Sequence, residues 1–181
     1  MITDERLLRA CLGHFATGVT VVTCEVDGVP HGATVNAFTA VSLDPALVLV
    51  SLHRRSRAGR HLAGRPFTVN VLGEDQRDLA ERFAGRRAEA PPRWAPRPRA
   101  GLAPRLAGSL ATLSCTPWAA YDGGDHVLFV GRVEEAEYRE GGRPLLFYEG
   151  GFRGLRAPHR IGISSSGRVR RPRAVEPSDR R

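Results

Sequence analysis

The chain has 181 residues, 41% of them hydrophobic and 25% charged, which is the composition of one soluble globular domain. Its most continuous apolar run, ALVLV at 46–50, is too short to span a bilayer, and Asp4 and Glu5 stand where a signal peptide would be basic, so we expect a cytoplasmic protein. The net charge of +8 suggests nucleic-acid binding as a hypothesis. Whether the hypothesis holds depends on where along the chain the positive charge lies.

A helix is predicted at the N-terminus. Thr3 can cap it, and Gly18 is expected to end it. Its apolar residues recur at helical spacing and share one face: Leu8, Cys11, Leu12 and Phe15.

Four strands are predicted next. The β-branched stretch 19–26 predicts the first, and Asp-Gly at 27–28 is a strong signal for a two-residue turn into a second strand at 29–36. After a bend, strands are expected at 38–42 and 46–53. The last of these is apolar on both faces, which favours a central place in the sheet.

Two helices and a strand follow. A short helix is predicted at 56–63, with Ser56 as its cap, and a strand at 66–72. The acidic start and final glycine of EDQRDLAERFAG predict a second helix over 74–85.

The rest of the chain contains a proline- and arginine-rich loop to residue 105 and then two strands around the turn at 122–125. Pro117 requires an edge or a bulge in the first of these strands, and RPLLFYEG at 143–150 closes the ordered part. Many short strands with few helices are typical of a closed antiparallel barrel with helical decorations. We expect one domain at 1–163 and a basic, disordered tail at 164–181.

The positive charge lies mostly outside the predicted strands. Residues 86–105 hold six arginines against one glutamate, and residues 168–181 hold six against two acidic residues. The chain contains no lysine, which indicates a bias toward arginine as much as selection for phosphate binding. Nucleic-acid binding through the tail therefore remains a minor hypothesis.

Several common sites are excluded by their motifs. No G-x-G-x-x-G stands between a predicted strand and helix, a P-loop is impossible without lysine, and no G-x-S-x-G occurs. The three cysteines are widely spaced, and neither C-x-x-C nor H-x-x-x-H is present, so no disulfide framework and no metal site is expected.

Three polar groupings remain. The stretch SLHRRSR at 51–57 can hold a phosphate through a helix N-terminus, the Ser56 hydroxyl and arginines, although a capped helix with solvated arginines explains it equally simply. Thr34 and Asn36 share one face of a strand and can hydrogen-bond a planar heterocycle or neighbouring backbone. The histidine of GGDH, His126, is a weak signal by itself.

In sequence order, five stretches resemble the short-chain flavin reductases, which are the reductase components of two-component flavin-dependent monooxygenases: HFATGVTVVT at 14–23, GATVNAFTAVSLDPALVLVSL at 32–52, FTVNVL at 67–72, ERFAG at 81–85 and GDHVLFVGRV at 124–133. The resemblance covers about residues 5 to 156. It implies a mainly β fold, the FMN-binding split barrel of Greek-key type, and a homodimer with the flavin near the subunit interface. It also implies an oxidoreductase that uses NADH or NADPH to reduce free FMN or FAD for a separate monooxygenase.

The same resemblance implies roles for individual residues. The strand at 34–37 meets the isoalloxazine ring, the segment at 51–57 holds the ribityl and phosphate part, and the helix end at 83–85 lies beside the phosphate or adenosine. The residues expected to bind flavin are Thr34, Val35, Asn36, Ala37, Ser51, Leu52, Arg55, Ser56, Arg57, Phe83, Ala84, Gly85, Tyr148 and Phe152. Asp125 and His126 are the catalytic candidates, and His126 is expected to position the nicotinamide rather than to act as an acid or base.

Departures from the family pattern leave the flavin and nucleotide preference open. Ala58 stands where the family often has a threonine, so one phosphate-binding hydroxyl is missing, and Glu149 stands in a region that is usually more basic. Two further alternatives are a split-barrel flavoprotein that acts directly on an organic substrate and a non-catalytic flavin carrier.

Overall fold

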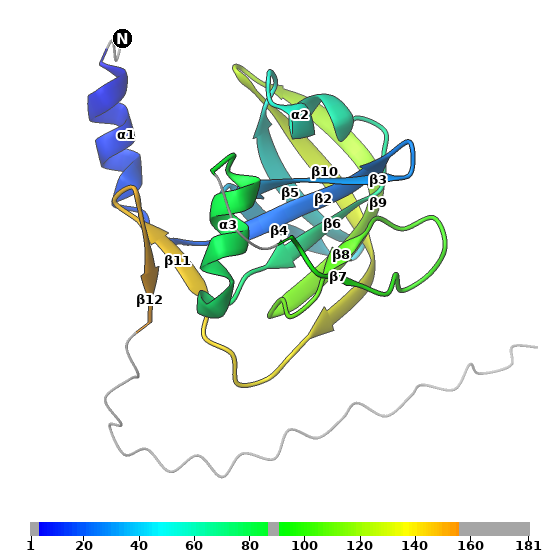
Figure 1. The fold of residues 1–181 in the computed structure, drawn as a ribbon. Coiled ribbons are helices and arrows are strands. Elements are labelled where there is room, and N and C mark those ends of the chain that lie inside the picture. Colours follow the sequence, from blue (N-terminus) through cyan, green and yellow to red (C-terminus); the bar gives the residue numbers. More distant parts are fainter. Residues whose placement is uncertain (1–3, 87–90, 156–181) are drawn as a thin grey trace, which may run out of the picture.

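In the computed structural model, which describes residues 4–86 and 91–155, an antiparallel sheet of seven strands forms the body of the protein (Figure 1). Its strands are β2 (Thr20–Val26), β3 (Val29–Val35), β4 (Phe38–Leu43), β5 (Ala46–His53), β6 (Phe67–Val71), β9 (Ala111–Gly123) and β10 (His126–Tyr138). They lie in the order β3-β2-β6-β9-β10-β5-β4. Two smaller sheets contain β1 (Thr17–Gly18), β11 (Leu145–Tyr148) and β12 (Gly151–Gly154), and β7 (Trp94–Ala95) and β8 (Arg105–Leu106).

The large sheet curls around a core but does not close. Its two edge strands, β3 and β4, are consecutive in the chain and are joined by only Asn36 and Ala37. At this bend the backbone N–H of Ser51, in β5, donates to the carbonyl of Ala37 at 3.0 Å, and β3 and β4 do not pair with each other. The mainly β class and the split-barrel fold are therefore confirmed, whereas the expectation of a fully closed barrel is wrong.

The sheet is buried on both faces near β2. Val22 and Cys24 point into the barrel core with Val50 and Phe67. Val21, one residue out of phase, packs instead into a second cluster. Because side chains alternate along a strand, one apolar strand supplies both cores. The second cluster contains Val19, Val21, Leu72, Ala80, Leu106 and Leu145.

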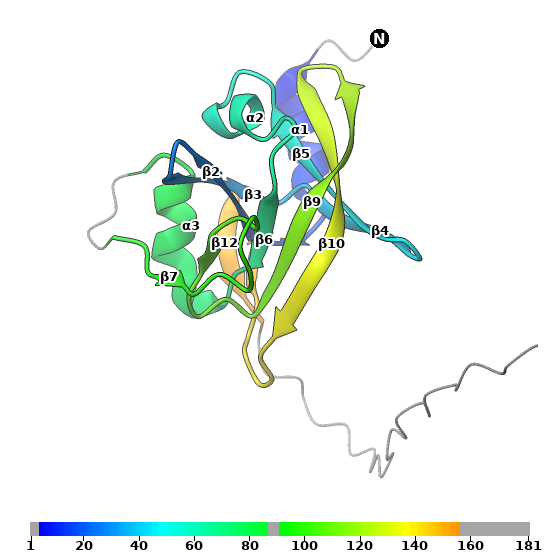
Figure 2. The same cartoon turned by 90° about the vertical axis from the view of Figure 1, so that its right-hand side faces the viewer.

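The turn signals in the sequence are confirmed. Asp27 and Gly28 both have positive φ (51° and 77°), which is the geometry of a type I′ hairpin turn between β2 and β3. The β9–β10 register shifts between the pairs Ala119–Val130 and Pro117–Gly131, so Trp118 forms the bulge that Pro117 predicts. This long hairpin runs the height of the sheet beside β5 (Figure 2).

The N-terminal helix is shorter than expected and lies apart from the sheet. Helix α1 (Glu5–Gly13) is capped by Asp4, whose carboxylate accepts from two backbone N–H groups, while Thr3 lies outside the described residues. It ends before Gly18 because Thr17 and Gly18 pair with β11. No residue of α1 is buried, and it stands with the β11–β12 hairpin to one side of the sheet (Figure 1).

The other two predicted helices are present but shorter than the predicted ranges 56–63 and 74–85. Helix α2 (Arg57–His61) is capped by Ser56, whose hydroxyl accepts from the Gly59 N–H at 2.9 Å. A short 3₁₀ turn, η1 (Glu74–Gln76), leads into α3 (Arg77–Phe83). None of the helices in the described ranges is long and apolar enough to cross a membrane.

Part of the proline- and arginine-rich segment is packed on the sheet. Leu102 and Ala103 are buried, and the Thr23 hydroxyl donates to the carbonyl of Pro104. The expected basic tail at 164–181 lies outside the described residues. Within the proline- and arginine-rich segment, residues 102–104 pack against β2 and β6, whereas residues 91–101 are exposed or half-buried.

Candidate functional site

The edge strand β3 presents unpaired backbone groups to the outside of the sheet. Because a two-residue turn joins β2 to β3, Val26 and Val29 exchange both backbone hydrogen bonds, and every second pair along the hairpin does the same. The N–H and C=O of Thr34 therefore point away from β2, and within the described residues β3 has no other neighbour in the sheet. Such an edge can pair with the hydrogen-bonding edge of a planar ligand.

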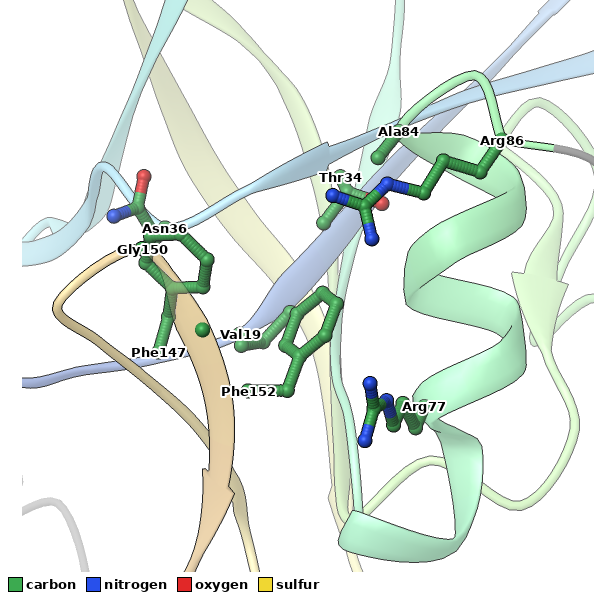
Figure 3. Close-up of a pocket in the computed structure, with 10 residues that line it drawn as sticks. Val19, Thr34, Asn36, Arg77, Ala84, Arg86, Phe147, Gly150 and Phe152 are labelled. Atoms are coloured by element: carbon green, nitrogen blue, oxygen red, sulfur yellow. The ribbon is translucent and has the colours of Figure 1, made fainter.

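A cavity of about 410 Å³ lies between β3, α3 and the β11–β12 hairpin, and we call it the α3 cavity (Figure 3). Four of the residues singled out from the sequence line it: Thr34, Asn36, Ala84 and Phe152. Sequence reasoning misses the other lining residues, which are Val19, Arg77, Arg86, Phe147, Gly150 and Gly151. The volume lies in the usual range for small-molecule sites.

Thr34 fixes α3 against β3. Its hydroxyl donates to the carbonyl of Ala80 at 2.6 Å, in the middle of the helix. Of the two uses considered for this hydroxyl, the structure therefore shows hydrogen bonding to backbone. On the same side, the ring of Phe83 packs on Gly32, where an added Cβ would lie 2.8 Å from the ring, and contacts Trp94 edge-on. Gly85 ends the helix with a φ of 87°.

Two arginines make the α3 cavity electropositive. Arg77 and Arg86 approach it from the two ends of α3, with the ring of Phe152 between them (Figure 3). The guanidinium carbon of Arg77 lies 5.7 Å from the centre of that ring, which is a cation–π distance. An aromatic surface flanked by two guanidinium groups suits a ligand that combines a flat ring with phosphate.

The segment at 51–57 lies at the end of β5 beside α2. The Ser56 hydroxyl is engaged in capping α2, and Arg55 and Arg57 are exposed. The Leu52 side chain is 4% exposed and belongs to the barrel core, so only its backbone can face a ligand. The backbone N–H of Arg55 donates to His53 Nδ1 at 3.1 Å.

His126 lies at the tip of the β9–β10 hairpin, next to the end of β5. Its Nδ1 is 2.7 Å from Asp125 Oδ1, and the hydrogen bond from His126 lowers the pKa of Asp125. The ring of His53 stands edge-on to the ring of His126, with the two ring centres 5.3 Å apart. Arg54 braces the hairpin through the Gly124 carbonyl at 2.9 Å. Among the residues the structure describes, no cluster of His, Cys, Asp and Glu could hold a metal ion.

The bend after β3 connects the two groups of predicted residues. The carbonyl of Ala37 accepts a hydrogen bond from the backbone N–H of Ser51, so this residue joins the end of β5 that lies near α2 and His126. Asn36 instead lines the α3 cavity. The Val35 side chain is 6% exposed and its carbonyl accepts from the Thr20 hydroxyl. Tyr148 lies farther away, and its hydroxyl is 3.5 Å from His14 Nδ1 beside α1.

A second, larger cavity of about 840 Å³ separates α1 from the sheet, and we call it the α1 groove. It is mostly apolar, and its residues include Leu12, Phe15, Thr17, Asn36, Ala37, Phe38 and Leu49. The buried hydroxyl of Thr17 has no hydrogen-bond partner among the described residues. An open apolar groove of this size is a surface that a further molecule would be expected to cover.

Comparison with known proteins identifies the family and the fold of this chain. The family model described as flavin reductase like domain matches residues 12–156. An NADH-dependent flavin reductase of a Rhodococcus species is 45% identical over 156 residues, which cover 82% of this chain and 85% of that protein.

Two further relatives agree. The reductase component of the 4-nitrophenol 4-monooxygenase/4-nitrocatechol 2-monooxygenase of Rhodococcus opacus is 43% identical over 152 residues, covering 82% of this chain and 80% of that protein. Among solved structures, the flavin reductase PheA2 superposes with a TM-score of 0.79 at 38% identity, covering 86% of this chain and all of that one. The residues that the family model matches, 12–156, include β3, the residues lining the α3 cavity and the β9–β10 hairpin with His126.

Proposed function

The chain belongs to the flavin reductase like family, and on that premise we propose that it is an NADH-dependent flavin reductase that releases reduced flavin to a separate monooxygenase. The observation that carries the proposal is the match over residues 12–156, which spans every strand around the candidate site. Relatives named as reductase components of monooxygenases support the partner.

The residues present fit a flavin. The free edge of β3 at Thr34 offers backbone donors and acceptors to the pyrimidine edge of the ring, and the bend at Asn36 and Ala37 lies beside it. The arginines of the α3 cavity and of the 51–57 segment can bind phosphate. When bound, flavin supplies the redox chemistry by accepting a hydride from the nicotinamide.

The protein's own task is to hold two flat rings together. Because hydride transfer needs the reacting atoms at about 3–3.5 Å, the residues beside the flavin site would have to hold the nicotinamide ring close to it. We assign His126 to positioning the nicotinamide, with Asp125 orienting the imidazole through the 2.7 Å hydrogen bond. No protein acid is required for hydride transfer itself.

We also propose that the enzyme is a homodimer in which a second copy covers the α1 groove. Leu12 and Phe15 on the helical side of this groove are 64% and 77% exposed, a large apolar surface for a single chain. The edge strand β4 continues the same surface, because its first residues, Phe38 and Thr39, line the groove as well. A two-fold interface uses the same patch on both subunits, so one exposed apolar face of this kind can serve both copies.

Steady-state oxidation of NADH and NADPH with added FMN, FAD or riboflavin tests the function. We expect turnover that depends on added flavin, and faster oxidation of NADH than of NADPH, as the names of the relatives suggest. A flavin that copurifies and never exchanges would favour an enzyme acting directly on an organic substrate. Flavin binding without oxidation of either nucleotide would make the protein a carrier.

A further inference from the structure

One carboxylate is shared by the two arginines of the α3 cavity. Glu81 Oε1 lies 3.1 Å from Nε of Arg77 and 3.8 Å from Nη1 of Arg86. Arg77 and Glu81 are one helical turn apart. Arg86 follows the end of the helix, and its backbone N–H donates to the Glu81 carbonyl at 3.0 Å. This hydrogen bond keeps Arg86 on the same side of the helix as Glu81.

Glu81 pairs with both arginines but is not among the residues that line the cavity. It is absent from the lining, whereas both guanidinium groups reach the lining on either side of Phe152 (Figure 3). Its side chain is 25% exposed, compared with 60% for Arg77 and 68% for Arg86, so the carboxylate is the least hydrated member of the three. The arginines therefore have solvent on one side and an internal anion on the other.

We propose that Glu81 is an internal competitor for the phosphate group that Arg77 and Arg86 would otherwise hold. The inference rests on the proposed function, because the phosphate in question belongs to a flavin or a pyridine nucleotide. A guanidinium fork matches a carboxylate and a phosphate almost equally well. Each ion pair with Glu81 must be weakened or shared when phosphate binds, so the carboxylate lowers the affinity.

Weak retention suits this enzyme. A reductase that supplies a separate monooxygenase must let the reduced flavin leave, and a pair of uncompensated arginines beside an aromatic ring would oppose release. Glu81 reduces that attraction without removing the positive groups that guide an anionic ligand into the cavity.

The test compares Glu81→Gln with the wild-type enzyme by titration with FMN, riboflavin and ADP-ribose. The substitution keeps the shape and removes the charge, so phosphate-bearing ligands should bind about two- to fivefold more tightly, the range expected for an ion pair near the surface. Riboflavin, which lacks phosphate, should bind equally well to both proteins. Tighter binding of FMN alone assigns the cavity to the flavin phosphate, and tighter binding of ADP-ribose alone assigns it to the nucleotide.

Asp78→Asn is the matched control. Asp78 lies on the same helix, is exposed and lies outside the cavity lining, so its loss changes the net charge equally. The proposal is overturned if Asp78→Asn tightens phosphate binding as much, if riboflavin responds like FMN, or if Glu81→Gln leaves every dissociation constant unchanged or weakens binding. In an Arg77→Gln/Arg86→Gln background, the Glu81 substitution should lose its effect.

These measurements are independent of turnover. The proposed function fails if the wild-type enzyme oxidises neither NADH nor NADPH with any flavin, whatever the binding results. The inference about Glu81 fails on dissociation constants alone, with equal thermal unfolding midpoints confirming that each variant is folded.

Discussion

The Nδ1 atom of His126 lies 2.7 Å from Oδ1 of Asp125, its neighbour in the turn between β9 and β10. The hydrogen bond from the imidazole is the main cause of the lowered pKa of Asp125. Electrostatic interaction with His126 and His53 lowers this pKa further. Asp125 therefore remains ionised at neutral pH and accepts a hydrogen bond from the Nδ1–H of His126. In the neutral imidazole this leaves Nε2 as the acceptor.

Replacing Asp125 by Asn should weaken the orientation of His126 and raise the KM for NADH about two- to tenfold, the usual effect of one hydrogen bond. His126→Ala should raise it at least as much. Initial rates at varied NADH and fixed FMN measure both effects, and the KM for FMN serves as the internal control. An unchanged KM for NADH and unchanged kcat in His126→Ala would exclude the positioning role.

Glu134 should stabilise the fold in a pH-dependent way. Its pKa is lowered from 4.5 mainly by the hydrogen bond from the Thr116 hydroxyl and then by Arg132 and Arg99. A group with a lowered pKa in the folded state stabilises it fully above the unfolded value, and this stabilisation is lost as the pH falls through the folded value. Glu134→Gln should therefore lower the Tm at neutral pH. The difference should begin to shrink as the pH falls below about 4.5 and disappear once the pH is below the lowered pKa of the folded state. A difference that persists in strong acid would contradict the ionic origin.

The cysteines should differ sharply in reactivity. Burial, with a smaller contribution from the charge of Glu134, raises the pKa of Cys115 to about 12, and burial also raises the pKa of Cys24. Only the thiolate reacts with alkylating agents. Iodoacetamide at mildly alkaline pH should therefore modify exposed Cys11 in the native protein and all three cysteines in guanidinium chloride, as counted by mass spectrometry. Equal labelling of Cys115 in the native state would show that the barrel core opens readily.

Local signals predict the strands and turns of this fold well. The turn requires positive φ at both of its central residues, and Asp27 and Gly28 are residue types that tolerate it. Pro117 disrupts the β9–β10 register because it lacks a backbone N–H. Each outcome depends on residues adjacent in the chain. The same is true of Ser56, whose side chain caps the helix that begins at the next residue.

Other features depend on partners far along the chain and are not readable locally. Gly18 is a plausible helix end, but its pairing with Leu146 takes it into a strand. By its local sequence, Arg77 belongs to a solvated helix face. In the folded chain Phe152, 75 residues further along, places its ring against the Arg77 guanidinium. Leu52 matches the family motif by position, whereas its side chain belongs to the core because alternate residues of β5 face inward.

Gly131 should be essential for packing of the long hairpin. A Cβ at this position would lie 2.4 Å from Cζ of Phe67 and 2.8 Å from Cβ of Cys115. Overpacking of this kind costs about 1–3 kcal/mol, so Gly131→Ala should lower the free energy of unfolding by that amount, measured by urea denaturation. Gly18→Ala is the control, because a Cβ added there would meet nothing within 4 Å and its φ is ordinary. Equal unfolding free energies for the two variants would mean that the β9–β10 bulge adjusts freely.

Charge on the α1 groove should separate the subunits. Leu12 and Phe15 are mostly exposed in the single chain, so Phe15→Glu removes little packing within it but places a carboxylate on the apolar face proposed to meet a second copy. Sedimentation equilibrium should find a dimer for the wild-type protein and a monomer, or a much weaker dimer, for Phe15→Glu and Leu12→Glu. Val29→Glu is the control, because Val29 is 54% exposed and lies in the β2–β3 hairpin, outside the groove. A wild-type monomer, or a Phe15→Glu dimer of unchanged strength, would place the interface elsewhere.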